Sequence, residues 1–201
     1  MGIPNNIPCG NCMLIAVTQS NVWFIEELFR HDDVKKYYVL RDDHAANIRS
    51  FCQYIVNSNI QNASLNYIIF NDYGDEVGFI SAEPVMNRAT GMPMWNVGYA
   101  VHPAHRRKGY ASSAVTGLSN YLLQNFSFQQ VTLDICEENI ASTNVAKKCG
   151  FSKPDDRTGY FDMEHPEIGM RFRWFKQLAG NRTVLFNQAV HFYRQKQYAE
   201  A

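Results

Sequence analysis

The sequence predicts an α/β fold built around a mixed sheet, in which strands outnumber helices. The first observation is a hairpin pattern, in which apolar runs at Leu65–Phe70 and Val77–Ile80 are joined by a turn sequence at Asp72–Asp75. The second is a strand–helix–strand unit, in which an apolar strand at Trp95–Val101 leads through a basic loop and a helix to a strand at Val131–Cys136. Hairpins combined with such units indicate a sheet with antiparallel and parallel pairs.

The other elements are predicted from the spacing of apolar residues. A strand is expected at Met13–Val17, followed by a helix that Thr18 caps. The helical period identifies three further helices, at residues 43–56, at about 110–124 and at about 140–148. Two more strands are expected around Gly159–Met163 and Met170–Phe175.

The chain of 201 residues has the length of one domain, and no linker rich in Pro, Gly or Ser divides it. We expect a domain over residues 1–177 and a C-terminal helical extension of the same domain over residues 178–201. The extension carries apolar residues over a wide face, including Val184, Val190 and Phe192. This face is expected to dock on its own domain, and a contact between two copies is the alternative, so we predict a monomer or a homodimer.

Composition argues against several classes of protein. The chain has 19 basic and 19 acidic residues, whereas binders of nucleic acid or anionic membranes carry a basic excess, so neither partner is expected. The longest aliphatic run, Met13–Val17, is far shorter than the roughly 20 residues that span a bilayer, and no signal peptide is predicted. Five cysteines without the spacing of a disulfide scaffold favour the reducing cytoplasm.

A basic loop follows the strand at Trp95–Val101 and runs directly into a helix. It contains Arg106, Arg107 and Lys108 and ends at Gly109, which has no side chain and so lets the backbone come close to a ligand. Backbone N–H groups at a helix N-terminus lack intrahelical partners and face the positive end of the helix dipole, which suits a phosphate or pyrophosphate. A solvated basic loop is the alternative interpretation.

A second helix begins about thirty residues later, with Asn139 as the predicted N-cap and Gly150 as its terminator. With this pair of motifs the chain resembles the GNAT superfamily of acyl-CoA-dependent N-acyltransferases. The matching segments are Arg106-Arg-Lys-Gly-Tyr-Ala111, Asn139-x-x-Ser142 with Lys148-x-Gly-Phe151, Val97-Gly-Tyr99, and Phe29-Arg-His-Asp-Asp-Val-Lys-Lys-Tyr37. The last three are similar to the branch that contains the ribosomal-protein N-terminal acetyltransferases, and the resemblance covers roughly residues 12–176.

The resemblance implies a mostly antiparallel sheet whose two central strands splay apart, with flanking helices and with acetyl-CoA, a co-substrate, lying in the splay. The pyrophosphate would lie on the N–H groups of residues 107–112, which include Tyr110, Ala111 and Ser112. Backbone groups near Val101 would pair with the pantetheine as an added strand does. Asn139 would reach the pantetheine arm from the other side.

The chain departs from the family at two catalytic positions. Many relatives carry a tyrosine acid four residues before the Gly-Phe, where this chain has Ala146, so Ser142 is the expected substitute as proton donor, with an ordinary first-turn serine as the alternative. Many relatives also carry a glutamate where this chain has Asn96, which can orient a substrate or water but cannot act as a base. Glu83, Glu137 or a water chain would then accept the proton.

The missing base bears on the choice of acceptor. At pH 7.5 about one-third of an α-amino group is neutral, whereas about 0.1 % of a lysine amine is neutral. An enzyme without an obvious base therefore suits an α-amine or another amine of low pKa better than it suits lysine.

A zinc site is not favoured. Cys9-Gly-Asn-Cys12 has the spacing of a metal knuckle, and His102 and His105 would be needed to complete four ligands. These pairs are far apart in the sequence and there is no second cysteine pair, so we predict no metal.

The leading functional hypothesis is an N-acetyltransferase that moves an acetyl group from acetyl-CoA to a primary amine by direct transfer. The acceptor would be a protein N-terminus or a small-molecule amine. The alternative is a non-catalytic module that binds acyl-CoA on the same fold. A nucleotide-binding domain ranks last, because the loop lacks Gly-x-Gly-x-x-Gly and Gly-Lys-Ser/Thr.

Overall fold

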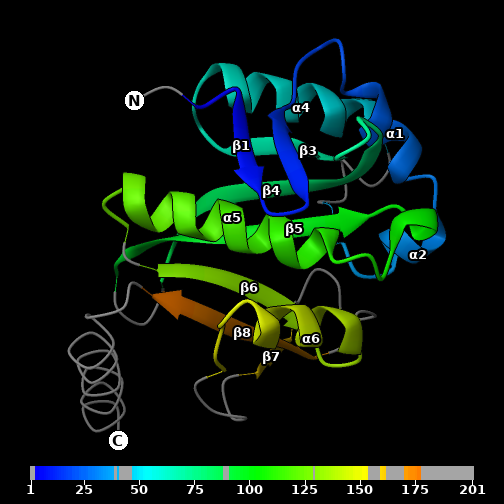
Figure 1. Cartoon of the computed structure of the whole chain (residues 1–201). Helices are drawn as coiled ribbons and strands as arrows, with labels where there is room; N and C mark the ends of the chain where they lie inside the picture. The colour runs from blue at the N-terminus through cyan, green and yellow to red at the C-terminus, as the bar shows by residue number, and fades with distance from the viewer. Residues whose placement is uncertain are drawn as a thin grey trace, which may run out of the picture.

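The computed structural model contains an eight-stranded sheet with helices on both faces (Figure 1). It describes residues 3–38, 40, 47–87, 91–128, 130–153, 159–161 and 170–177. The strands are β1 (Asn6–Cys9), β2 (Cys12–Ala16), β3 (Leu65–Asn71), β4 (Glu76–Met86), β5 (Pro93–Val101), β6 (Gln130–Cys136), β7 (Gly159–Phe161) and β8 (Met170–Gln177). The helices are α1 (Trp23–Leu28), α2 (Asp32–Lys35), α4 (Ile48–Ile60), the short 3₁₀ helix η1 (Pro103–His105), α5 (Tyr110–Asn125) and α6 (Ile140–Lys148).

The sheet order is β1-β2-β3-β4-β5-β6-β8-β7, and the pair β5–β6 is parallel while all other pairs are antiparallel. The predicted mixed α/β class is therefore confirmed. The parallel pair is short, because Trp95 aligns with Val131 and Asn96 with Thr132, and no later register is recorded for these two strands. Beyond Asn96 the strands diverge, which is the central splay that the family resemblance implied.

Two hydrophobic clusters cover the two faces of the sheet. One lies between the sheet and α5 with α6, and includes Leu118, Leu122 and Trp95. The other lies between the sheet and α1 with α4, and includes Ile25, Ile55 and Phe79. Figure 1 shows α5 running along β4 and β5, with α1 and α4 gathered at the other side of the sheet.

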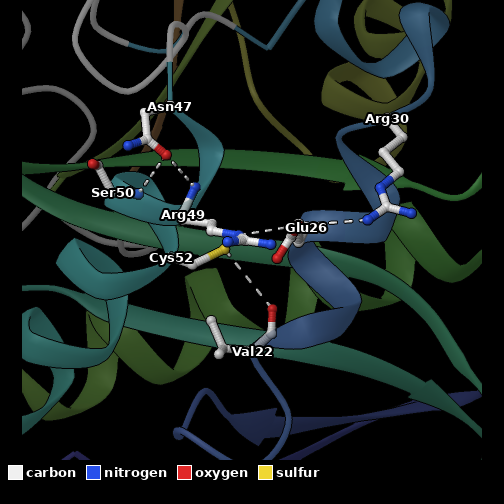
Figure 2. Close-up of polar contacts among 7 residues, drawn as sticks. All are labelled: Val22, Glu26, Arg30, Asn47, Arg49, Ser50 and Cys52. Atoms are coloured by element: carbon white, nitrogen blue, oxygen red, sulfur yellow. Dashed lines mark hydrogen bonds and ion pairs between the residues drawn. The ribbon is translucent and has the colours of Figure 1, made fainter.

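Helix α4 begins later than the sequence predicts. Asn47 is its N-cap, and its side-chain oxygen accepts hydrogen bonds from the N–H groups of Arg49 at 3.1 Å and Ser50 at 3.4 Å (Figure 2). The predicted start at Asp43 falls among residues 41–46, outside the described part of the chain. The helix continues to Ile60, four residues past the expected end at Val56.

The prediction that Thr18 caps the first helix is wrong. The N-cap position belongs to Val22, which makes no side-chain cap bond. Thr18 instead opens a turn, because its N–H donates to Asn21 Oδ1 at 2.8 Å and its carbonyl accepts from the N–H of Val22 at 3.1 Å. Figure 2 shows the carbonyl of Val22 facing the thiol of Cys52 on α4, at 3.9 Å, which joins the two helices.

Strand β1 and helix α2 were not predicted. Pro8 interrupts the pattern of β1, but a strand at the edge of a sheet tolerates proline because one of its rows of N–H groups faces no neighbour. Gly10 and Asn11 form the hairpin turn to β2, with Gly10 at a φ of 61°. Helix α2 has four residues, too few for a helical period to be recognised.

The elements predicted around the basic loop are confirmed. Strand β5 and helices α5 and α6 have the expected bounds to within two residues. Strands β7 and β8 lie where strands were expected, although residues 162–163 are outside the described part of the chain. The division at residue 177 and the C-terminal extension at 178–201 also lie outside the described residues and stay predictions. In the described part, no helix is long and apolar enough to cross a membrane.

Candidate active site

A cavity of about 980 Å³ passes through the sheet at the splay between β5 and β6. Ser142 and Val145 of α6 line it on one face of the sheet, and Tyr38 and Phe51 line it on the other. The cavity therefore joins the loop before α5 to the space under α2 and α4. An elongated ligand can lie in it with its two ends on opposite faces.

Most of the residues predicted from sequence line this cavity. They are Asn96, Val101, Arg106, Arg107, Gly109, Tyr110, Ala111, Ser112, Asn139 and Ser142. Lys108 does not line it, and the carbonyl of Lys108 is turned to Asn11 on the β1–β2 hairpin. Sequence reasoning considered both Glu83 and Glu137 as the group that accepts the proton. Glu83 lines the cavity and Glu137 does not.

The loop before α5 has the backbone shape of an anion site. Arg107 has a φ of 62° and Gly109 a φ of 88°, so left-handed residues alternate with ordinary ones as in the backbone nests that bind anions. A non-glycine residue in this conformation is strained, and such strain concentrates at functional sites. Gly109 is the N-cap of α5, and the unpaired N–H groups of the first helical turn follow it.

The Arg106 side chain holds the loop in place. Its Nε donates to the carbonyl of Val101 at 3.2 Å, and its Nη1 lies 3.1 Å from Oδ2 of Asp33 on α2. A second contact joins the same elements, since Nε2 of His31 and Nε2 of His102 are 3.0 Å apart. Helix α2, which lines the cavity, is thus attached to the loop at two points.

The edge of β5 that faces the splay carries free hydrogen-bonding positions. The N–H of His102 donates to the carbonyl of Val77 on β4 at 2.9 Å. Backbone groups of successive residues point alternately to the two edges of a strand. The groups of Val97, Tyr99 and Val101 therefore face β6, with which β5 pairs only through Trp95 and Asn96 in the described strands, and the Val101 carbonyl is occupied by the Arg106 Nε donor. The cavity thus offers a short strand edge, and the pairing of Val101 with a pantetheine stays a prediction.

A polar row crosses three strands on the α2 side of the sheet. Glu83 on β4 aligns with Asn96 on β5, and Asn96 aligns with Thr132 on β6. The Thr132 hydroxyl donates to Asn96 Oδ1 at 3.4 Å and to the Trp95 carbonyl at 3.1 Å. Asn96 is therefore oriented by a neighbour while the Glu83 carboxylate faces the cavity.

Aromatic side chains line the same cavity as that carboxylate. They are Tyr37, Tyr38, Phe51 and Tyr54, and Tyr38 is close enough to Glu83 for the carboxylate to affect its pKa. Tyr38 shares a hydrogen bond of 2.9 Å with the Ser81 hydroxyl, and burial raises its pKa while the nearby Glu83 adds to the rise. A carboxylate among aromatic faces suits a cationic amine.

Asn139 and Ser142 lie at the start of α6. The Oδ1 of Asn139 accepts the N–H of Ser142 at 3.1 Å, which confirms the predicted N-cap. Part of the Asn139 side chain is therefore used inside its own helix. Ala146, one turn after Ser142, is fully buried and does not line the cavity.

Sequence reasoning named Tyr99 within the Val97-Gly-Tyr99 motif but assigned it no role in the site. This side chain of β5 lines the cavity, and its hydroxyl is buried with no hydrogen-bond partner among the described residues. Burial raises the pKa of Tyr99 to about 12, and the Ser142 hydroxyl acts in the opposite direction. The two hydroxyls are therefore near each other without the geometry of a formed hydrogen bond. Only the fold brings β5 and α6 together here, so the sequence carried no signal for this pair.

The cysteine pair is part of the hairpin rather than a metal knuckle. Cys9 and Cys12 are register partners, and their thiols donate to the carbonyls of Ile7 at 3.4 Å and of Cys9 at 3.3 Å. Burial raises the pKa of the Cys9 thiol to about 11 and that of Cys12 to about 12, which disfavours the thiolate that binds metal. Across the described residues no group of three or more His, Cys, Asp or Glu side chains could hold a metal ion.

Comparison with known proteins agrees with this geometry. The family model described as acetyltransferase (GNAT) domain matches residues 14–152. The chain is similar to an acetyltransferase of the GNAT family from Bacillus anthracis, with 19% identity, a TM-score of 0.67 and coverage of 86% of this chain and 98% of that chain.

The chain is also similar to two structures whose names state the molecule that receives the acetyl group. The ribosomal-protein-S5-alanine acetyltransferase from Vibrio fischeri is 13% identical, with a TM-score of 0.70 and coverage of 87% and 97% of the two chains. The spermidine N-acetyltransferase from Vibrio cholerae, solved with CoA and spermine, is 14% identical, with a TM-score of 0.66 and coverage of 83% and 95%. Likeness at such low identity shows a shared fold. A comparison with curated protein sequences found no match.

Proposed function

Because this chain belongs to the acetyltransferase (GNAT) family, we propose that it transfers an acetyl group from acetyl-CoA directly to a primary amine. The observation that carries the proposal is the cavity through the splayed sheet, with an anion-binding loop on one side and a carboxylate among aromatic rings on the other. Such a cavity brings a phosphate-bearing thioester and a cationic amine to one point from opposite faces.

The residues at the loop fit the phosphate end of acetyl-CoA. The left-handed conformations of Arg107 and Gly109 and the free N–H groups at the start of α5 provide donors for a pyrophosphate. The open edge at Tyr99 and the N–H of Val101 provides donors and an acceptor for the amides of a pantetheine arm, while the Val101 carbonyl is held by Arg106. When bound, acetyl-CoA supplies an acetyl group activated as a thioester.

The acceptor amine must lose a proton before it can attack. We assign Glu83 as the group that accepts this proton, directly or through water, with Asn96 orienting the amine or the water. The aromatic rings around Glu83 would hold the amine while it is still an ammonium. Glu83 aligns with Asn96, the last residue at which β5 pairs with β6 in the described strands, so it lies near the point where the two strands separate.

The departing sulfur needs a hydrogen-bond donor in place of the absent tyrosine of α6. We propose that the hydroxyls of Tyr99 and Ser142 are these donors, because both line the cavity on the α6 side of the sheet and Tyr99 has no other partner among the described residues. Tyr99, with its raised pKa, donates a hydrogen bond and keeps its proton.

We propose a protein N-terminus or a small-molecule amine as the acceptor. Relatives of both kinds share the fold, since one neighbour is named for a ribosomal protein and another for spermidine. The cytoplasmic location and the monomeric or homodimeric state stay predictions.

Thermal unfolding with acetyl-CoA, and with ATP and NAD as controls, tests the binding part of the proposal. A ligand at a hundred times its Kd stabilises a protein by about 2.7 kcal/mol, or roughly 5–10 °C for a domain of this size. We expect this shift with acetyl-CoA alone. No shift at saturating acetyl-CoA would refute the proposal, and a shift with ATP or NAD would favour the nucleotide-binding alternative.

An amine screen that follows the release of CoA thiol tests turnover. With an acceptor in hand, Glu83→Gln is expected to lower kcat about 100-fold and to flatten the acid limb of the pH profile. Glu137→Gln, outside the cavity, is the matched control and is expected to retain activity. Binding of acetyl-CoA without turnover on any amine would point to the non-catalytic module.

A further inference from the structure

The turn between β1 and β2 packs against the start of α5. Gly10 lies beneath Ser113, since a Cβ on Gly10 would be 3.3 Å from the Ser113 hydroxyl. Cys9 fills the space over Gly117 one turn further along, where a Cβ would collide with the cysteine sulfur. The segment that has the spacing of a metal knuckle therefore serves as a support for the N-terminus of α5.

Asn11 extends this contact to the anion-binding loop. Its Nδ2 donates to the carbonyl of Lys108 at 3.0 Å, across 97 positions of sequence. The same nitrogen lies 3.6 Å from the point where a Cβ on Gly109 would be. Asn11 is thus the side chain that faces the Lys108–Gly109 peptide from outside the cavity, which Asn11 does not line.

The planarity of the peptide bond gives this contact a consequence. In a trans peptide the C=O of one residue and the N–H of the next point in opposite directions. All the described peptide bonds are trans. With the carbonyl of Lys108 held on the Asn11 side, the N–H of Gly109 points to the other side, and Gly109 lines the cavity.

We propose that Asn11 is a positioning residue for the pyrophosphate of CoA, because it fixes the peptide whose N–H from Gly109 faces the anion. The inference rests on the proposed use of acetyl-CoA and extends it to a residue of the N-terminal hairpin. A carbonyl oxygen can be held only by a hydrogen-bond donor, which in Asn11 is Nδ2. The other polar atom of the Asn11 side chain, Oδ1, is buried without a partner among the described residues. The Nδ2 bond to Lys108 is therefore the contact that orients Asn11.

The test compares Asn11→Ala with Asn125→Ala. In the wild type Asn125 makes the same kind of bond at the far end of α5, where its Nδ2 donates to the carbonyl of Tyr121 at 2.9 Å. Asn11 does not have a positive φ, so alanine suits its backbone, and Asn11→Ser is a second variant that is too short to reach Lys108. Titration calorimetry of each protein with CoA and with pantetheine, which lacks the pyrophosphate, gives the two affinities.

We expect Asn11→Ala and Asn11→Ser to weaken the binding of CoA about fivefold, the effect of one lost hydrogen bond, with no change for pantetheine. Asn125→Ala should change neither affinity. In ¹⁵N spectra, CoA should shift the Gly109 amide strongly in the wild type and in Asn125→Ala, and much less in Asn11→Ala.

Three results would overturn the inference. Unchanged CoA affinity in both Asn11 variants, or an equal loss for CoA and pantetheine, would leave Asn11 with a general structural role. A Gly109 amide that CoA shifts as strongly in Asn11→Ala as in the wild type would show that the peptide does not depend on Asn11. If the wild type bound no CoA, the proposed function itself would fail, which is a different result from any of these.

Discussion

Removing the Tyr99 hydroxyl should make the protein more stable and less active. The hydroxyl is buried and has no hydrogen-bond partner among the described residues. A buried polar group without a partner costs about 1–3 kcal/mol, and we take about 1 kcal/mol because the Ser142 hydroxyl is nearby. Since 1 kcal/mol shifts the Tm of a domain of this size by about 2–4 °C, Tyr99→Phe should raise the Tm of the unliganded protein by that amount.

Tyr67 is the control for Tyr99, because removing its hydroxyl should lower the Tm instead of raising it. Tyr67 is fully buried, but its hydroxyl donates to the carbonyl of Pro4 at 3.2 Å. Tyr67→Phe loses that bond and should lower the Tm by about 2–4 °C, with no effect on turnover.

Activity measurements complete the comparison. Tyr99→Phe should lower kcat about 10–100-fold with little change in the Kd for acetyl-CoA, because the hydroxyl is needed when the sulfur departs. Thermal unfolding of the unliganded variants and thiol-release kinetics with saturating acetyl-CoA measure the two effects. A Tm that falls as in Tyr67→Phe would show that Tyr99 is hydrogen-bonded, and an unchanged kcat would remove it from the mechanism.

Three further perturbations have expected outcomes. In Gly117→Ala the new Cβ collides with the Cys9 sulfur, which should lower the free energy of unfolding by about 1–3 kcal/mol in urea titrations. Adding Cys9→Gly removes that sulfur and should restore most of the loss. Burial, followed by the neighbouring imidazoles, lowers the pKa of His102, so the unfolded chain binds a proton at higher pH than the folded protein does. The free energy of unfolding should therefore fall as the pH drops below about 6.5. In unfolding experiments at several pH values, His102→Asn should reduce that fall. Arg173→Met removes both 2.7 Å contacts to the Asp134 carboxylate, which is 11% exposed. Because hydrogen bonds to a charged group contribute about 2 kcal/mol, this variant should lower the Tm by about 4–8 °C in calorimetry.

Local patterns in the sequence predicted the elements that form the anion site. The apolar alternation of β5, the helical period of α5 and the glycine between them are all short-range signals, so their bounds could be found without tertiary information. The Asn139 cap of α6 is a signal of the same kind. The splay was expected only from the family resemblance, because no periodicity reports how far two strands run together.

The residues that sequence reasoning missed depend on contacts between distant segments. Tyr99 was noted as part of a motif, but its open hydroxyl beside Ser142 follows from how α6 docks on the sheet. Asn11 lies in a segment considered for metal binding, although Gly-Asn between two strands is a recognised hairpin signal. Pro8 obscured that signal, because proline lowers the expectation of a strand and only the edge position of β1 accommodates it.

The splay also has a consequence for where the sheet carries its unpaired strand groups. Unpaired strand edges are a hazard in solution, because another chain can add to them and begin aggregation. Here the open backbone groups of β5 lie at the centre of an eight-stranded sheet and are enclosed by α5, α6 and β6. A partner must enter the cavity to reach these groups, as the pantetheine arm would in the proposed function. The fold thus places the hydrogen-bonding capacity of an edge strand inside a cavity of the sheet rather than at its outer edge.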